Sequence, residues 1–275
     1  MLLEKTPIKL LARRGQRSAA TIRRRLGQAL EKLTSEPAVP AIPAGDLVLL
    51  IDGLWSKLRG ERWVLYNMAL KPLTANTAWF LRPHLRAGHE GMRGWEEALA
   101  TIPSELIGRI RALVSDGLSG IDVLARAHGW PLQLCHRHLI SALDSQLGHP
   151  RRQRTSQRPG RDIRAAILEA LVTKDDRRLL EICRETAALC THPNCTKGLR
   201  AVARRFLHCQ CHYRTYLLHQ ELGIPTTTCA VESMHRQLRR VISTVNNPGS
   251  MLRRVAAYLQ LRPTITCNGP IHPQN

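Results

Sequence analysis

The sequence predicts an α/β protein in which helices flank a mixed sheet and an all-helical insertion interrupts the core. Residues 47–51 form an apolar run of strand length, which is typical of a buried central strand. Later strand-like segments alternate with helical ones, and this alternation favours parallel strands joined by helical crossovers. Residues 162–223 have helical periodicity and almost no strand signal, so we expect an insertion made of helices alone.

The expected elements can be placed in chain order. A basic helical arm over 1–36 ends at a proline-rich linker, because proline restricts the residue before it. Strands are expected where apolar, β-branched and aromatic residues gather, at 47–51, 62–70, 78–81, 110–115 and 130–134. Helices are expected at 95–99, 104–108, 120–128, 135–147, 226–245 and 251–261. This order predicts an antiparallel meander extended by parallel strands, with an exposed loop at 151–161 and a loose tail from Pro263.

These elements divide the chain into five segments. We expect a basic arm with its linker (1–45), the first part of the core (46–148), a basic loop with the helical insertion (149–225), the last helices of the core (226–262) and a tail (263–275).

The charge of the chain predicts a polyanionic partner. Of 275 residues 41 are Lys or Arg and 21 are Asp or Glu, which gives a net charge of +20. Most of the basic residues are arginines, and guanidinium groups bind phosphate bidentately. Runs of basic residues often form only a solvent-exposed surface. Three such runs in a chain that also brings acidic residues together, as argued below, favour a groove that binds DNA. The expected DNA contacts are Arg151, Arg152, Arg154, Arg158, Arg236, Arg239 and Arg240.

The sequence favours a cytoplasmic protein without a membrane span. The longest aliphatic run, 47–51, is far shorter than the roughly 20 residues that a span needs. The N-terminus lacks the apolar core of a signal peptide. The eight cysteines show no paired CxxC framework, so neither a disulfide scaffold nor a zinc ribbon is expected.

Two aspartates each follow an apolar run and precede a glycine. They are Asp52 and Asp116, and each is expected at the end of a strand. Asp-Gly alone is most often a turn signal. Two such acids on adjacent parallel strands, however, would meet at one edge of the sheet, where α/β folds build their sites. A bound cation is the usual resolution of their repulsion.

A third acid, Glu232, lies on a strongly basic amphipathic helix. The core face of that helix is predicted to be Val231, Met234, Leu238, Ile242 and Val245. Glu232 is off this face and is spaced to share a face with Arg236 and Arg239, so an ordinary surface salt bridge is the alternative to a functional role.

This pattern resembles the DDE transposases of bacterial insertion sequences, in particular the group related to Mutator-like elements. The resemblance depends on Asp52 in LLIDG, Asp116 in LVSDG, Cys135 and His138 in CHRH, and Glu232 in VESMHRQLRR. The acids are 64 and 116 residues apart, and the second spacing is similar to that of members with a helical insertion before the glutamate. The resemblance covers residues 47–261.

The resemblance implies an RNase H-like fold in which Asp52, Asp116 and Glu232 hold two Mg²⁺ or Mn²⁺ ions. The implied activity is DNA strand cleavage at the element ends, followed by strand transfer into target DNA. The implied partners are DNA and further copies of the chain on DNA, near the nucleoid, with neither a membrane nor a small-molecule substrate.

Several alternatives remain at this stage. Only 51 residues precede Asp52, fewer than in full-length members, which suggests a truncated copy or an inactive DNA-binding remnant. Another RNase H-like nuclease, such as a junction resolvase, is a further alternative. Cys135 and His138 share a helical face near the site and are expected to pack or to contact substrate rather than to bind zinc. Trp55 is either a base-stacking residue or a core tryptophan.

Overall fold

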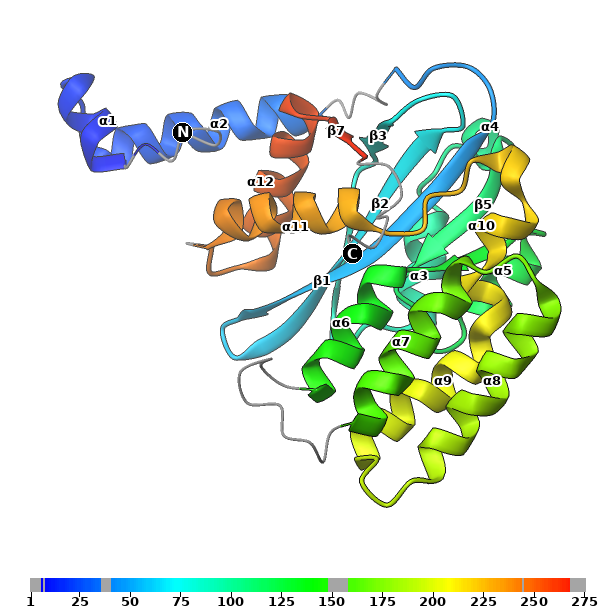
Figure 1. Ribbon diagram of the computed structural model, residues 1–275. Coiled ribbons are helices and arrows are strands. Elements are labelled where there is room, and N and C mark those ends of the chain that lie inside the picture. Colours follow the sequence, from blue (N-terminus) through cyan, green and yellow to red (C-terminus); the bar gives the residue numbers. More distant parts are fainter. Residues whose placement is uncertain (1–5, 7, 36–40, 148–157, 244, 268–275) are drawn as a thin grey trace.

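A seven-stranded sheet forms the centre of the molecule (Figure 1). The computed structural model describes residue 6 and residues 8–35, 41–147, 158–243 and 245–267. The strands are β1 (Leu47–Leu58), β2 (Glu61–Pro72), β3 (Thr77–Phe80), β4 (His84–Ala87), β5 (Ile110–Ser115), β6 (Leu132–Leu134) and β7 (Thr264–Thr266). Their order is β6-β5-β1-β2-β3-β7, and β4 pairs with β2.

The sheet is mixed, as the sequence predicts. Strands β1, β2 and β3 form an antiparallel meander, whereas β5 runs parallel to β1 and β6 runs parallel to β5. The predicted α/β class with a mixed sheet flanked by helices is therefore confirmed.

Strand β1 is longer than predicted, and this changes the position of Asp52. The strand does not end at the Asp-Gly pair, because Leu54 and Leu58 continue its alternation of buried side chains. Asp52 pairs with Asn67 of β2 in the middle of the ladder. The turn comes later, where Arg59 and Gly60 adopt positive φ angles of 50° and 91°.

Helices cover both faces of the sheet (Figure 1). Those before and within the insertion are α3 (Met92–Leu99), α4 (Ser104–Ile107), α5 (Ile121–Ala127), α6 (His136–Leu147), α7 (Arg158–Val172), α8 (Asp176–Thr191), α9 (Lys197–Tyr213) and α10 (Thr215–Leu218), followed by a 3₁₀ turn at Gln220–Leu222. Helices α3 to α9 contribute buried side chains to the core that includes Leu47, Leu49 and Ile51, whereas Tyr216 of α10 and Leu222 of the 3₁₀ turn pack against the opposite core. The later helices α11 (Cys229–Ile242) and α12 (Pro248–Leu261) pack on the face that carries Val48 and Leu50.

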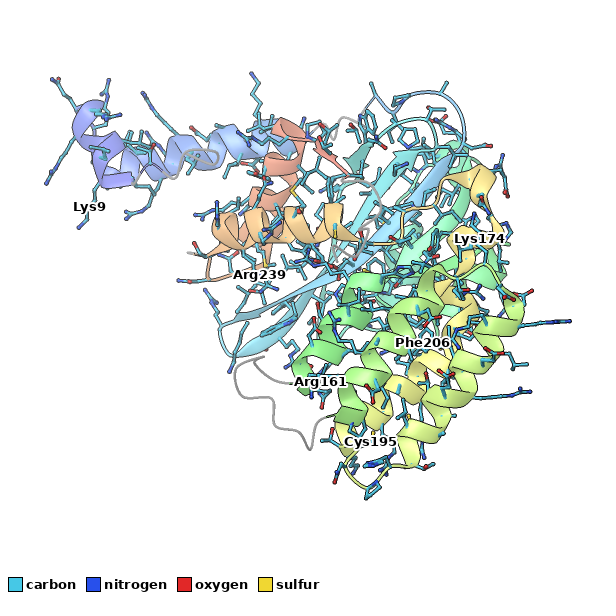
Figure 2. All side chains as sticks on the ribbon, in the orientation of Figure 1. Lys9, Arg161, Lys174, Cys195, Phe206 and Arg239 are labelled. Carbon is cyan, nitrogen blue, oxygen red and sulfur yellow. The ribbon has the colours of Figure 1, made fainter. Side chains whose placement is uncertain are left out.

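The N-terminal arm is helical, as predicted. It consists of α1 (Ile8–Arg14) and α2 (Ala19–Ser35), and α2 packs against α12. The arm projects away from the sheet, with Lys9 near its far end, whereas Phe206 is buried within the helical insertion (Figure 2).

Three local features differ from the predicted arrangement or lie partly outside the described residues. The tail is not loose throughout, because Thr264–Thr266 forms β7 and closes the sheet beside β3. Strand β4 was missed, because its four residues show no clear alternation of apolar and polar side chains. The predicted loop over 151–161 lies outside the described residues up to 157, and helix α7 already begins at Arg158.

The described part of the chain contains no helix with both the length and the apolar character that a membrane crossing requires.

Candidate metal centre

The parallel pairing of β1 and β5 brings the two aspartates together. Leu50 lies opposite Val114, and the same register two residues later brings Asp52 level with Asp116. Asp52 is only 6% exposed. Asp116 follows the last residue of β5, and Gly117 turns the chain there with a φ of +89°. One ligand atom from each aspartate and one from His138 all lie within 4.8 Å of one another.

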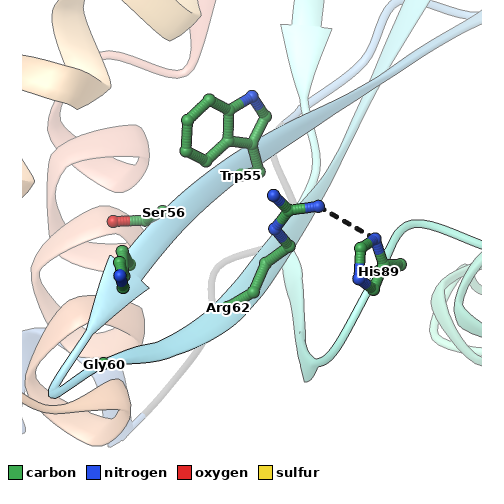
Figure 3. Close-up of a pocket in the computed structure, with 6 residues that line it drawn as sticks. Trp55, Ser56, Gly60, Arg62 and His89 are labelled. Atoms are coloured by element: carbon green, nitrogen blue, oxygen red, sulfur yellow. Dashed lines mark hydrogen bonds between the residues drawn. The ribbon is translucent and has the colours of Figure 1, made fainter.

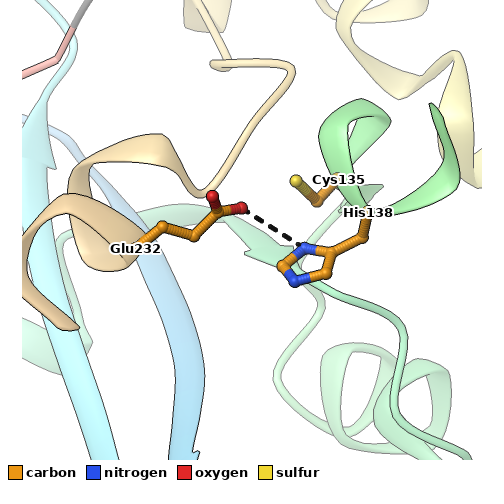
Figure 4. A group of neighbouring side chains, drawn as sticks. All are labelled: Cys135, His138 and Glu232. Carbon is orange, nitrogen blue, oxygen red and sulfur yellow. Dashed lines mark ion pairs between the residues drawn. The ribbon is translucent and has the colours of Figure 1, made fainter. Parts of the chain in front are cut away.

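Helices α6 and α11 bring the third acid to the same imidazole (Figure 4). Ligand atoms of Cys135, His138 and Glu232 also lie within 4.8 Å of one another. Nδ1 of His138 is 3.6 Å from Oε1 of Glu232. His138 is therefore the common neighbour of all three acids that the sequence singles out.

The ion pair of Glu232 differs from the same-helix salt bridge that was the alternative to a functional role. Its Oε2 lies 2.8 Å from Nε of Arg137 on α6. Arg236 instead donates a hydrogen bond to Ser233, and Arg239 is exposed. Helical spacing reveals only neighbours on the same helix, so the partner on α6 could not be read from it.

The Cys135 thiol is hydrogen-bonded to the start of α11. The backbone N and the Oγ1 of Thr228 donate hydrogen bonds to its sulfur over 3.3 and 3.4 Å. Burial raises the pKa of the thiol, so it stays protonated at neutral pH. Cys135 thus packs against the start of α11, which agrees with the packing role expected for it. Thr228 precedes α11 but uses its hydroxyl here, and it makes no side-chain cap.

The structure adds a fourth carboxylate, Glu90, that the sequence analysis missed. It lies between β4 and α3, and Nε1 of Trp95 donates a hydrogen bond to its Oε1 over 3.1 Å. A Cβ atom built on Gly53 would be 2.4 Å from this carboxyl group, so Glu90 lies directly against β1 beside Asp52. The residues around Glu90 carry no motif. The one signal in the sequence was the glycine after Asp52, since only a residue without a side chain leaves room there for the Glu90 carboxyl group.

Buried aromatic side chains hold Glu90 in place. Trp95 is 1% exposed and packs edge-on against Tyr66, with ring centroids 4.9 Å apart. The hydroxyl of Tyr66 accepts a hydrogen bond from the backbone N of Gly91, the residue after Glu90. Contacts with buried core residues therefore fix the position of the Glu90 carboxylate, although Glu90 lies in a loop.

A buried histidine lies on the other side of Asp52. His235 of α11 has its Nδ1 3.6 Å from Oδ2 of Asp52, and its Nε2 lies 2.9 Å from Nδ2 of Asn67. Because Nδ2 of Asn67 also donates to the carbonyl of Leu65, Nε2 acts as the acceptor and Nδ1 carries the proton toward Asp52. Burial, with further contributions from Arg239 and His138, lowers the pKa of His235 to about 3, so the ring is neutral.

The acids at this site are crowded without enough positive charge. Burial, and next the charge of Asp116, raise the pKa of Asp52 well above its usual range, and Glu232 and Glu90 act in the same direction. Burial and Asp116 also raise the pKa of Glu90 to about 7. In addition, Nδ1 of His138 and Oε1 of Glu232 are buried without a hydrogen-bond partner. Carboxylate oxygens with one imidazole fit Mg²⁺ or Mn²⁺, and a divalent cation would relieve this repulsion.

The raised pKa of Glu90 predicts a pH effect on the metal-free protein. Between about pH 4.5 and pH 7 the folded state keeps a proton on Glu90 that the unfolded state has lost. Stability relative to a Glu90→Gln variant should therefore fall as the pH rises through this window. In the presence of chelator, the melting temperature of the wild type should fall relative to that of Glu90→Gln by about 2–4 °C for each 1 kcal/mol of stability that is lost. Melting curves that run parallel for the two proteins from pH 4 to 8 would contradict this assignment.

The remaining predicted residues are not all brought to the centre. Arg151, Arg152 and Arg154 lie outside the described residues, and Arg158 is the first residue of α7. The predicted DNA-contacting arginines of α11 are all exposed: Arg236, Arg239 and Arg240. Figure 2 labels Arg239. Trp55 is 58% exposed, so the alternative of a core tryptophan is wrong.

Comparisons with known proteins do not identify a family: no protein-family model matches the chain, and no curated protein matches it significantly.

Proposed function

We propose that the chain is a metal-dependent enzyme that cleaves and joins DNA strands, a DDE-type transposase with an RNase H-like catalytic domain. The observation that carries the proposal is the convergence of Asp52, Asp116 and Glu232 on His138 from three separate elements. Exposed carboxylates are common without a metal, but here one acid is almost fully buried. The antiparallel meander extended by parallel strands agrees with the proposed fold.

Asp52, Asp116 and Glu232 would hold the ions, with His138 beside them. Bound there, two Mg²⁺ or Mn²⁺ ions would activate the attacking oxygen and stabilise the charge on the leaving oxygen of the phosphodiester. The chain itself supplies rigid positions for the ligands. Backbone pairing with Asn67 of β2 fixes Asp52, and the neutral ring of His235 lies beside its carboxylate without competing as a cation.

The DNA partner is supported by charge. The exposed arginines of α11 lie one and two turns after Glu232, and the net charge of the chain is +20. Phosphate contacts by such residues position DNA without reading its sequence. A homo-oligomer on DNA and a nucleoid-associated location in the cytoplasm belong to the same proposal.

Incubation of the purified chain with supercoiled plasmid and Mn²⁺ tests the activity. We expect metal-dependent nicking, and joining of an oligonucleotide 3′ end to the plasmid. Nicking without joined products would instead favour an RNase H-like nuclease. Retarded but intact plasmid at every metal concentration would favour an inactive DNA-binding remnant and would overturn the proposal.

Metal binding should also stabilise the fold. At about 100 times its dissociation constant, a ligand that binds only the folded state adds about 2.7 kcal/mol, or about 5–10 °C in melting temperature. We expect Mn²⁺ to produce a shift of this size at neutral pH, and Asp116→Asn to remove most of it. An equal shift in wild type and variant would place the ion elsewhere.

A further inference from the structure

The β1–β2 hairpin carries a hollow outside the metal centre (Figure 3). It has a volume of about 290 Å³. Its lining combines one aromatic ring with cationic and polar groups: Trp55, Ser56, Lys57, Gly60, Arg62 and His89. We call this hollow the Trp55 pocket.

The indole in this pocket is arranged as an open platform. Trp55 is 58% exposed, although a large apolar ring is normally covered in a folded chain. The guanidinium carbon of Arg62 lies 5.6 Å from the ring centroid, within the range of a cation–π contact. Nη1 of Arg62 also lies 2.9 Å from Nδ1 of His89, which fixes the direction of the arginine (Figure 3).

Two like charges oppose each other across the hairpin. Lys57 and Arg62 are directly paired in the antiparallel register, and both side chains are exposed. Like charges in this arrangement destabilise a strand pair. A bound anion would remove that repulsion, so the pocket offers a site for phosphate next to a platform for a flat ring.

The Trp55 pocket lies farther along β1 than the metal centre. Trp55 comes three residues after Asp52, which corresponds to about 10 Å, and because side chains alternate along a strand the two lie on opposite faces of the sheet. The carboxyl group of Glu90 is the link between them, because it occupies the space beside Gly53 on the same face as Trp55 and Glu90 directly follows His89 of the pocket. A DNA strand at the centre could therefore reach the pocket within about three nucleotides at 3.4 Å each.

We propose that the Trp55 pocket binds one unpaired nucleotide of the DNA substrate, with its base stacked on Trp55 and its phosphate between Lys57 and Arg62. This inference depends on the proposed function, because it names the form of DNA that the same enzyme holds beside its metal centre. Stacking on an aromatic ring accepts any base and requires a base outside the duplex stack.

The test compares a base with its absence. Fluorescence anisotropy measures how tightly the full chain, in the presence of chelator, binds a labelled single-stranded oligonucleotide of about 12 nucleotides. A second oligonucleotide has the same phosphates but abasic sites throughout its middle. We expect wild type to bind the first about 5- to 150-fold more tightly, and Trp55→Ala to lose most of that preference. Trp55→Phe should retain part of it, whereas Lys57→Ala should weaken both oligonucleotides alike.

Matched controls separate this site from general charge and exposure. Arg177→Ala removes an exposed arginine on α8, and Leu218→Ala removes an apolar side chain that is 69% exposed on α10. Neither should change the preference for bases. An unchanged preference in Trp55→Ala would overturn the inference, as would an effect of Trp55→Ala on self-association instead of on DNA, which would assign the ring to a contact between copies.

Plasmid nicking by wild type separates the failure of this inference from the failure of the proposed function. Metal-dependent nicking without any base preference would leave the enzyme assignment in place and remove the nucleotide site. Absence of both nicking and DNA binding would remove both.

Discussion

Replacing Asp52 with Asn is expected to lower metal-dependent plasmid nicking by roughly 10³-fold or more. Asn keeps the shape of the side chain but removes the charge that balances a divalent ion. Because Asp52 is paired with Asn67 in the middle of the β1–β2 ladder, the substituted side chain should keep its position in the sheet. Asp116→Asn and Glu232→Gln should have comparable effects, since the three acids act as one unit.

Controls must show that only the chemistry is lost. Glu105→Gln changes an exposed acid on α4 and should nick at the wild-type rate. Plasmid retardation in chelator should remain nearly unchanged in all the variants, because phosphate contacts come from the basic residues. Wild-type nicking by Asp52→Asn would refute the assignment of the metal centre.

Replacing Gly94 with Ala is expected to cause the largest loss of stability. A Cβ atom there would lie 2.1 Å from Cζ of Tyr66, which is fully buried and cannot retreat. Overpacking of this kind costs about 1–3 kcal/mol. The melting temperature should therefore fall by about 2–12 °C in thermal unfolding. Tyr66 also holds the backbone next to Glu90 through its hydrogen bond with Gly91, so the increase in melting temperature that Mn²⁺ produces should be smaller in this variant.

Gly27→Ala is the matched control, because it makes the same substitution in α2 where nothing lies within 4 Å of the added atom. It should stabilise the helix by about 0.5–1 kcal/mol, since glycine is a poor helix former. Equal effects of the two substitutions would show that the contact with Tyr66 is not constraining.

The order of the elements other than β4 and β7 could be predicted, because it depends on local patterns. The core face of α11 is buried as its periodicity predicts, including Val231, Met234 and Leu238. Pairs that depend on tertiary contacts could not be predicted. Glu90 approaches Gly53 through the packing of α3, and Arg137 reaches Glu232 between two helices that are distant in the chain.

The position of Asp52 was misread for a different reason. Asp-Gly is a strong turn signal, but burial of Leu54 and Leu58 outweighs it and extends β1. The meeting of Asp52 with Asp116 was nevertheless predicted, because it depends on the parallel pairing of their strands and not on where β1 ends.

The start of α6 and the segment before α11 are fastened together beside the acids. The backbone N of His136 donates to the carbonyl of Thr226 over 2.9 Å, and the backbone N of Thr228 donates to the sulfur of Cys135. The part of the chain between these two points, which contains the helical insertion, thus begins and ends at the same place. Residues added at its distal bend between α8 and α9, at the bottom of Figure 1, would lengthen the appendage without shifting Glu232, so variation in size there is compatible with unchanged chemistry.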